Sequence, residues 1–380
     1  MKVRKIVSAE EMYADVQDVS NSYTVHNIIE YSSAIGYDKL NNAFREAISY
    51  CNGVCVRKKG NYWISSDDKI NLEEITFETY DNYINNKFFN EVLDYKLESL
   101  KGYVIHFRDS KKSLIVFRFF HGVIDGKGAI LLMENFLKAL NKMELVQCTN
   151  QYNILDLIDK NKFKKLKENN KPNHSLKNFC TIDSKKLFWT KIKIDRYVPS
   201  VVAKIAKIIQ EEFENESVKF MIPVDLRHYN REKNYLGNII LPIYLQVNRE
   251  DSINNIAGKM MMKLKNTDEL NINNINNMNY NLIPKPIRKL GLKMFFSTIH
   301  NKNKFFVGAI ISHLGRIDIT KYNKINIDDM IFLPNHQPLT PFSINITEFN
   351  NETNVVICTF ENQIPEKTLN SLKRRIGELK

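Results

Sequence analysis

The sequence has few cysteines and no pattern that would link them. The five cysteines are an odd number, no C-x-x-C motif occurs, and only Cys51 and Cys55 lie close together. This usage argues against a disulfide framework and against a zinc site. We therefore expect no bound metal, and a reducing compartment, the cytoplasm, as the location.

Long apolar runs are also missing. The run "IILPIYLQV" (239–247) is only strand-sized, and the N-terminal "MKVRKIVSAEEMYADV" has no apolar signal core. We therefore expect no transmembrane segment. The stretch "PKPIRKLGLKMFF" (284–296) is basic and then apolar, which is also typical of a helix lying on a membrane surface. We favour a helix packed on the second half of the chain and keep peripheral membrane association as an alternative.

Basic residues are in excess but are not concentrated. Lys and Arg number 55 against 43 Asp and Glu, which gives a formal charge of +12. Such an excess suits anionic partners, for example a phosphate-bearing co-substrate or an acidic carrier protein. No basic run interleaved with aromatic residues occurs, so nucleic acid is not an expected partner.

The length of the chain predicts two core-bearing units. A chain of 380 residues exceeds the usual size of a single hydrophobic core. Residues 151–178 are polar, rich in Lys and Asn and contain Pro172, so we expect a crossover linker between residues 1–150 and 179–380. Strand-like and helix-like patterns mix in both halves, and the predicted fold class is α/β, an α+β sandwich.

One stretch carries the main chemical signal. In "SLIVFRFFHGVIDGKGAILLMENFLKAL" (113–140), a buried strand ends at His121 and an amphipathic helix follows a short turn. A lone histidine at a strand end is more often structural. Here, however, a carboxylate at Asp125 is costly in an apolar turn unless a cation pairs with it. The turn also holds glycines that permit tight turning and close approach of another group, at positions Gly122, Gly126 and Gly128.

These residues resemble a known signature. "FHGVIDGKG" is similar to the H-x-x-x-D-G motif of the chloramphenicol acetyltransferase-like superfamily of CoA-dependent acyltransferases. "FMIPVDLRHY" (220–229), "YLGNIILP" (235–242) and "IISHLGRI" (310–317) resemble the P-V-D-x-R, G-N and S-N-x-G elements of its second half. Within the superfamily the chain looks most like bacterial alcohol or polyketide-associated acyltransferases and stand-alone condensation domains. It departs from the pattern at Phe120, where many members have histidine, and at His313, where asparagine is common.

The resemblance implies a fold and roles for individual residues. It implies two chloramphenicol acetyltransferase-like subdomains, each a mixed sheet flanked by helices, with a tunnel between them. His121 is then the general base, and Asp125 braces its loop by pairing with an arginine, for which Arg227 is the candidate. Gly126 supports the turn. A donor to the oxyanion is expected on a strand that faces the cleft, with Ser312 and Asn238 as the choices.

The implied activity is acyl transfer. The resemblance implies a CoA thioester, or an acyl-phosphopantetheine, as co-substrate and not as a tightly bound cofactor. The acceptor is the hydroxyl or amine of a small molecule or lipid, and we expect a monomer. One alternative is a stand-alone condensation enzyme whose donor is carried by an acyl carrier protein. Another is a catalytically silent scaffold of the same fold.

Overall fold

A computed structural model describes residues 2–380 except 21–22, 67–69, 152–153, 167–171, 181–185, 231–233, 273–279 and 323. Parts of the expected linker (151–178) and of the loop-like, Asn-rich stretch at 269–286 therefore lie outside the described residues. The division of the chain at the linker stays a prediction.

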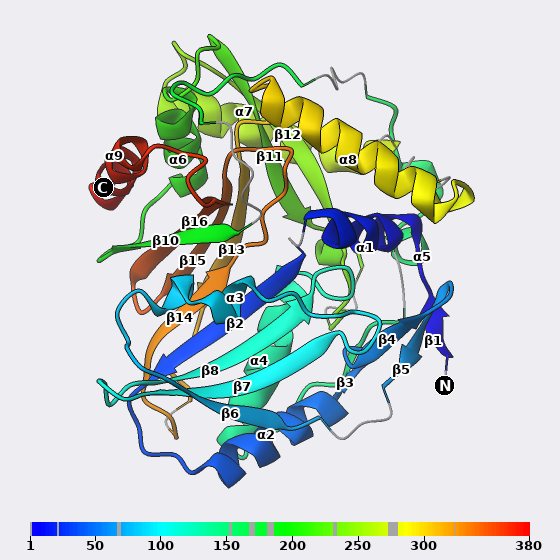
Figure 1. Cartoon of the computed structure of the whole chain (residues 1–380), viewed down its shortest axis with the longest axis vertical. Coiled ribbons are helices and arrows are strands. Elements are labelled where there is room, and N and C mark those ends of the chain that lie inside the picture. Colours follow the sequence, from blue (N-terminus) through cyan, green and yellow to red (C-terminus); the bar gives the residue numbers. More distant parts are fainter. Residues whose placement is uncertain are drawn as a thin grey trace.

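Two large mixed sheets form the framework (Figure 1). The first has five strands in the order β14-β2-β8-β7-β6, with bounds Ile327–Leu333, Thr24–Tyr31, Ser113–Phe120, Leu100–Phe107 and Leu72–Phe77. The second has six strands in the order β10-β16-β15-β13-β11-β12, with bounds Leu187–Ile194, Glu352–Phe360, Ser343–Phe349, Ile310–Ile317, Ser217–Asp225 and Ile240–Asn248. The predicted mixed α/β architecture with helices flanking the sheets is confirmed.

Smaller elements complete the chain. A three-stranded sheet joins β1 (Lys2–Lys5), β5 (Tyr62–Ser65) and β4 (Val56–Lys59), and β3 (Cys51–Asn52) pairs with β9 (Cys148–Thr149). The α-helices are α1 (Ser8–Ser20), α2 (Tyr37–Ser49), α3 (Lys87–Asn90), α4 (Gly126–Leu140), α5 (Ile154–Leu157), α6 (Val201–Gln210), α7 (Ile253–Lys265), α8 (Lys285–Asn301) and α9 (Glu366–Gly377). Short 3₁₀ turns are η1 (Tyr83–Asn85), η2 (Lys160–Lys162), η3 (Leu226–Tyr229) and η4 (Asp268–Leu270).

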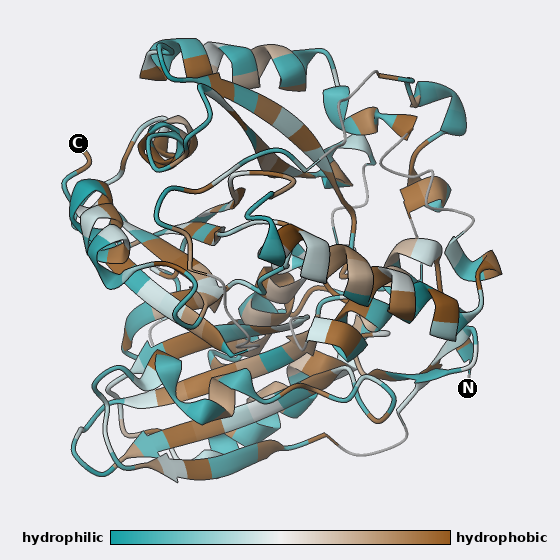
Figure 2. Cartoon of the chain, turned by 45° about the horizontal axis from the view of Figure 1, so that its top comes forward, coloured by the Kyte–Doolittle hydropathy of each residue, from teal (hydrophilic) through white to brown (hydrophobic). Residues whose placement is uncertain are grey.

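The hydrophobic run of β8 is explained by burial on both faces of its strand. Phe117 packs against α2 and α4, where its ring stacks on Phe44 with centroids 5.3 Å apart. On the opposite face, Val116 joins a core that includes Trp189 and Cys358 from the second sheet. Figure 2 shows the resulting hydrophobic bands along the strands of this sheet. Because both faces are covered, β8 holds the residue that follows it in a fixed place.

The two halves of the sequence interlock. Strand β14, which follows the second half's strand β13 in the chain, pairs antiparallel with β2 of the first half. Helix α8 lies beside α1, and its Arg288 forms ion pairs with Glu11 and Asp15 of α1. Further along α8, Ile299 packs in the hydrophobic core of the second half. The helix at 284–296 therefore bridges both halves and does not pack on the second alone. No helix among the described residues is long and apolar enough to cross a membrane.

Gly128 is required by a close approach between the halves. A Cβ at this position would lie 2.0 Å from the backbone oxygen of Leu236, which cannot move as a flexible side chain would. We expect Gly128→Ala to lower the free energy of unfolding by about 3 kcal/mol or more, measured by urea denaturation. The control is Gly258→Ala in α7, where nothing lies within 4 Å. It should raise stability by up to about 1 kcal/mol, because alanine favours a helix. Equal effects of the two substitutions would contradict the assignment.

Candidate active site

His121 directly follows β8, and its own backbone and ring are both fixed. Its N–H donates to the carbonyl of Tyr23 at 2.9 Å, and its ring atom Nδ1 lies 3.0 Å from the carbonyl oxygen of Ile124. A carbonyl only accepts hydrogen bonds, so Nδ1 of the neutral ring carries the proton. The other nitrogen, Nε2, is then left with its lone pair. The bond at Nδ1 is the ring hydrogen bond that the structure shows for His121 within its described residues.

The surroundings of His121 favour the neutral ring. Burial lowers the pKa of His121, and the hydrogen bond to Ile124 and the nearby Asp125 carboxylate offset this only in part. A lowered pKa leaves the imidazole uncharged at neutral pH. The ring at position 121 thus has the protonation state and the open lone pair that a general base needs.

Asp125 caps the helix that follows the turn and is fully buried. Its Oδ1 accepts from the N–H of Gly128 at 2.8 Å, and its Oδ2 accepts from the N–H of Ile239 at 2.9 Å. Arg227 donates to both oxygens, from Nη2 at 2.9 Å and from Nη1 at 3.0 Å. Each carboxylate oxygen therefore has two donors, which offsets the cost of burying the charge. The structure shows the expected ion pair between Asp125 and Arg227.

Arg227 is equally well satisfied. Besides Asp125, its guanidinium donates to Asp225 at 2.8 Å and to the carbonyls of Tyr235 at 2.9 Å and Gly237 at 3.0 Å. These bonds use all five N–H groups of the side chain. Burial lowers the pKa of Arg227, but the carboxylates of Asp125 and Asp225 together raise it more, so the pKa lies further above its ordinary value. The pair is thus a fixed brace and not a proton donor or acceptor.

The segment Tyr235–Ile239 of the second half lies along the turn of the first half. In addition to the contacts of Ile239 with Asp125, the Leu236 carbonyl packs against Gly128, and Asn238 donates from Nδ2 to the His121 carbonyl at 3.0 Å. Gly126 is also a point of close approach, because a Cβ there would lie 2.7 Å from the Leu314 side chain in β13. We call the segment 235–239 the clasp, because it bonds to both ends of the turn.

The two expected oxyanion donors occupy different places. Asn238 lies at the turn, but one of its N–H groups is already bonded to the His121 carbonyl. Ser312 lies in β13, opposite Asn345 of β15, and no hydrogen bond joins it to His121 or Asp125 within the described part of the chain. The structure brings together His121, Asp125, Gly126, Arg227 and Asn238 and leaves Ser312 on the neighbouring strand. The oxyanion role of either donor stays a prediction.

Aromatic residues around the turn were not predicted. The ring of Tyr13, from α1, stacks on His121 with centroids 5.7 Å apart and planes 16° apart. Phe120, where the chain departs from the resembled motif, packs on Tyr95 at 4.8 Å and on Trp63 at 5.9 Å. An aromatic thus fills the position as packing. No pattern in the sequence predicts a helix over residues 8–20, so none singles out Tyr13.

The tunnel expected between the subdomains stays a prediction. A cavity of about 490 Å³ lies between α1, the β4–β5 turn and the start of α8, and one of about 410 Å³ lies beside it, near Tyr95 and Lys289. Neither is lined by His121. Among the described residues, no group of three or more His, Cys, Asp or Glu side chains is placed to hold a metal ion.

The fold is similar to that of solved condensation domains and of a protein solved in complex with coenzyme A. Polyketide synthase associated protein 5 from Mycobacterium tuberculosis matches with a TM-score of 0.67 at 11% identity, over 99% of this chain and 97% of that one. The condensation domain of the monacolin K polyketide synthase MokA matches with a TM-score of 0.64 at 9% identity, over 98% and 96%. F. graminearum TRI101, in complex with coenzyme A and T-2 mycotoxin, matches with a TM-score of 0.61 at 10% identity, over 98% and 97%.

These similarities show the fold, and the fold implied by the sequence resemblance is confirmed. No protein-family model and no curated protein sequence matches the chain.

Removing the charge of Asp125 tests the brace. We expect Asp125→Asn to lower the free energy of unfolding by about 3–5 kcal/mol, because the Arg227 guanidinium would remain buried without its counterion. The matched control is Asp225→Asn, which removes the partly exposed second partner of Arg227 and should cost about 1 kcal/mol or less. Urea denaturation measures both. A smaller loss for Asp125→Asn than for Asp225→Asn would contradict the brace.

Proposed function

We propose that this protein transfers an acyl group from a thioester to a hydroxyl or amine acceptor, with His121 as the general base. The observation that carries the proposal is the tautomer of His121. Its Nδ1 is bonded to the Ile124 carbonyl, so the neutral ring carries its proton on Nδ1 and its lone pair on Nε2. The fold supports the same conclusion, because condensation domains and a CoA-bound acyltransferase share it.

The reaction requires one base that acts twice. Nε2 of His121 takes the proton of the acceptor as its oxygen or nitrogen attacks the thioester carbonyl. The tetrahedral intermediate then collapses, the carbon–sulfur bond breaks, and the sulfur leaves as a thiol with the proton from Nε2. Asp125 and Arg227 hold the turn and take no part in proton transfer. An oxyanion donor, Ser312 or the second N–H of Asn238, would stabilise the intermediate by about 3 kcal/mol.

The donor is proposed to be acyl-CoA. The bound coenzyme A of F. graminearum TRI101 and the net charge of +12 support a phosphate-bearing donor. Condensation domains among the similar structures keep a donor on an acyl carrier protein as the alternative. The acceptor is proposed to be a small or lipidic alcohol or amine. The monomeric state and the cytoplasmic location stay predictions.

Substitution of His121 tests the base. We expect His121→Gln to lower kcat about 10²–10⁴-fold, because the amide has no basic lone pair comparable to imidazole. Release of free thiol from a panel of acyl-CoA and acyl-carrier donors, against a panel of alcohols and amines, measures the rate. The control is His106→Gln, since His106 is half-exposed and bonds to Ser113 on the far end of the hairpin.

Two results would count against the proposal. Equal turnover of His121→Gln and the unaltered protein would exclude His121 as the base. Thiol release from neither donor class, by folded protein against every acceptor, would favour the silent scaffold.

The pH dependence follows from the burial of His121. Its pKa lies below the ordinary value of about 6.5, so the neutral form persists as the pH falls below that value. We expect the acid limb of kcat/KM to be centred below pH 6.5, because kcat/KM declines only as the pH falls through the lowered pKa. The thiol-release assay between pH 5 and 8 measures this. An acid limb centred above pH 7 would contradict the assignment.

A further inference from the structure

Helix α1 places an aromatic side chain over the proposed base. The Tyr13 ring lies nearly parallel to the His121 imidazole, with planes 16° apart. Tyr13 also stacks on Tyr23 at 4.8 Å, and the Tyr23 carbonyl accepts the backbone N–H of His121. The imidazole therefore has an aromatic wall along one side, built from α1 and from the residue before β2.

The hydroxyl of Tyr13 is connected to the same turn. Asn238, which donates to the His121 carbonyl, also acts on this hydroxyl as a hydrogen-bonding group that lowers its pKa. Burial raises the pKa of Tyr13 to about 12, with contributions from Asp125 and Glu10, so the phenol is uncharged at neutral pH. Tyr13 thus contacts the ring of His121 directly and reaches its backbone through Asn238.

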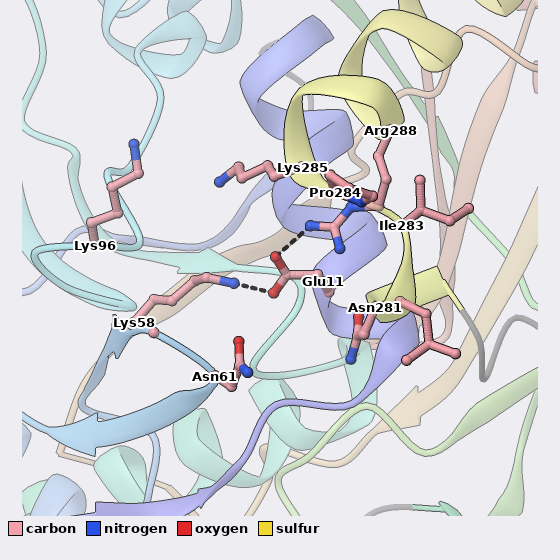
Figure 3. A pocket seen from close by; sticks show the side chains of 11 residues that line it. Glu11, Lys58, Asn61, Lys96, Asn281, Ile283, Pro284, Lys285 and Arg288 are labelled. Carbon is pink, nitrogen blue, oxygen red and sulfur yellow. Dashed lines mark hydrogen bonds and ion pairs between the residues drawn. The ribbon is translucent and has the colours of Figure 1, made fainter.

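Ion pairs hold α1 in place on the side away from His121. Arg288 of α8 donates to Asp15 at 2.7 Å and to Glu11 at 2.8 Å, and Lys58 of β4 also pairs with Glu11 (Figure 3). The neighbouring Glu10 accepts from the Trp63 indole at 3.1 Å. These partners come from distant segments of the chain, so the position of α1 is set by the folded molecule as a whole.

We propose that Tyr13 is a positioning residue for His121: its ring fixes the plane of the imidazole and keeps water from that face, and its hydroxyl steadies Asn238. The effect of Tyr13 on catalysis rests on the proposed function. Its effect on the orientation and the pKa of His121 does not. Tyr13 touches no reacting atom in this scheme and acts through His121.

The charges facing His121 determine whether its pKa rises or falls when the Tyr13 ring is removed. Tyr13 and Tyr23 are neutral phenols. The charged group in the loop of His121 that acts on the imidazole is Asp125, and Asp125 is paired with Arg227. Burial is therefore the dominant influence on the pKa of His121. Removing the Tyr13 ring admits water and raises the pKa towards its ordinary value of about 6.5. More of the base is then protonated at a given acidic pH, and the acid limb of the pH–rate profile moves to higher pH.

The experiment compares Tyr13→Ala, which removes ring and hydroxyl, with Tyr13→Phe, which removes only the hydroxyl. Tyr50→Ala, at an exposed tyrosine outside the site, is the control. A histidine NMR titration of the whole protein reports the pKa of His121, whose signal is identified by its loss in His121→Gln. Thiol release gives kcat and KM for each variant. Thermal unfolding checks the fold, and Tyr13→Leu replaces Tyr13→Ala if the latter does not fold.

We expect the pKa of His121 to rise in Tyr13→Ala and to stay unchanged in Tyr13→Phe and Tyr50→Ala. We also expect kcat to fall about 10–100-fold in Tyr13→Ala with little change in KM, because a misplaced base slows the chemical step. Tyr13→Phe should lose less than about tenfold, the effect of one hydrogen bond. An unchanged His121 pKa in Tyr13→Ala would overturn the inference. The titration needs no substrate, so absence of acyl transfer in the unaltered protein would overturn the proposed function without obscuring this result.

Discussion

The arrangement of the site depends on one buried ion pair between the two halves of the chain. Asp125 belongs to the turn after β8 and Arg227 to the turn after β11. Besides bonding to each other, Asp125 accepts from Gly128 and from Ile239 of the clasp, and Arg227 donates to Asp225 and to two carbonyls of the clasp. A buried pair of this kind adds little net stability over an apolar pair, but it tolerates only one geometry. Its main effect is therefore positional: it fixes the turn that carries His121 to a particular place on the second sheet.

Other segments that are distant in sequence also hold the turn that carries His121. The clasp lies on one side, with Leu236 against Gly128, and α1 lies on the other, with Tyr13 against His121. Helix α1 is itself held by Arg288 of α8, in the second half of the sequence. His121 is thus held by its own turn, through Ile124, and by two segments that are distant in sequence, so small displacements of either half would change its surroundings. A base aligned by its scaffold before the substrate binds avoids the cost of ordering it during the reaction.

The sequence predicted the structural elements and site residues that a local pattern or a motif indicates. The run ending in "FFHGVIDGKG" shows a strand, a turn and a helix within thirty residues, and the superfamily resemblance supplied Arg227 as the partner of Asp125. Helix α1 was missed because its buried residues include Glu10, Glu11 and Asp15, which read as a solvated surface in sequence. Glu10 pairs with the nearby Arg4, but Glu11 and Asp15 pair with Arg288, which is 273 positions from Asp15, and no local pattern reveals such a pairing. Strand β14 was missed likewise, since "IDDMIFL" has two acids directly after its first residue and pairs with a strand almost 300 residues earlier.

The return of β14 to the first sheet bears on how the protein is made. Until residues 327–333 emerge from the ribosome, β2 lacks its outer neighbour, although nearly all of its side chains are destined for burial. A strand edge of this kind is a template for pairing with other chains. The N-terminal half therefore has an unpaired, aggregation-prone edge at β2 until β14 has been synthesised. If that half were expressed separately, this edge would stay unpaired. Because β14 is synthesised late, the edge of β2 needs protection from aggregation during synthesis, for example by chaperones.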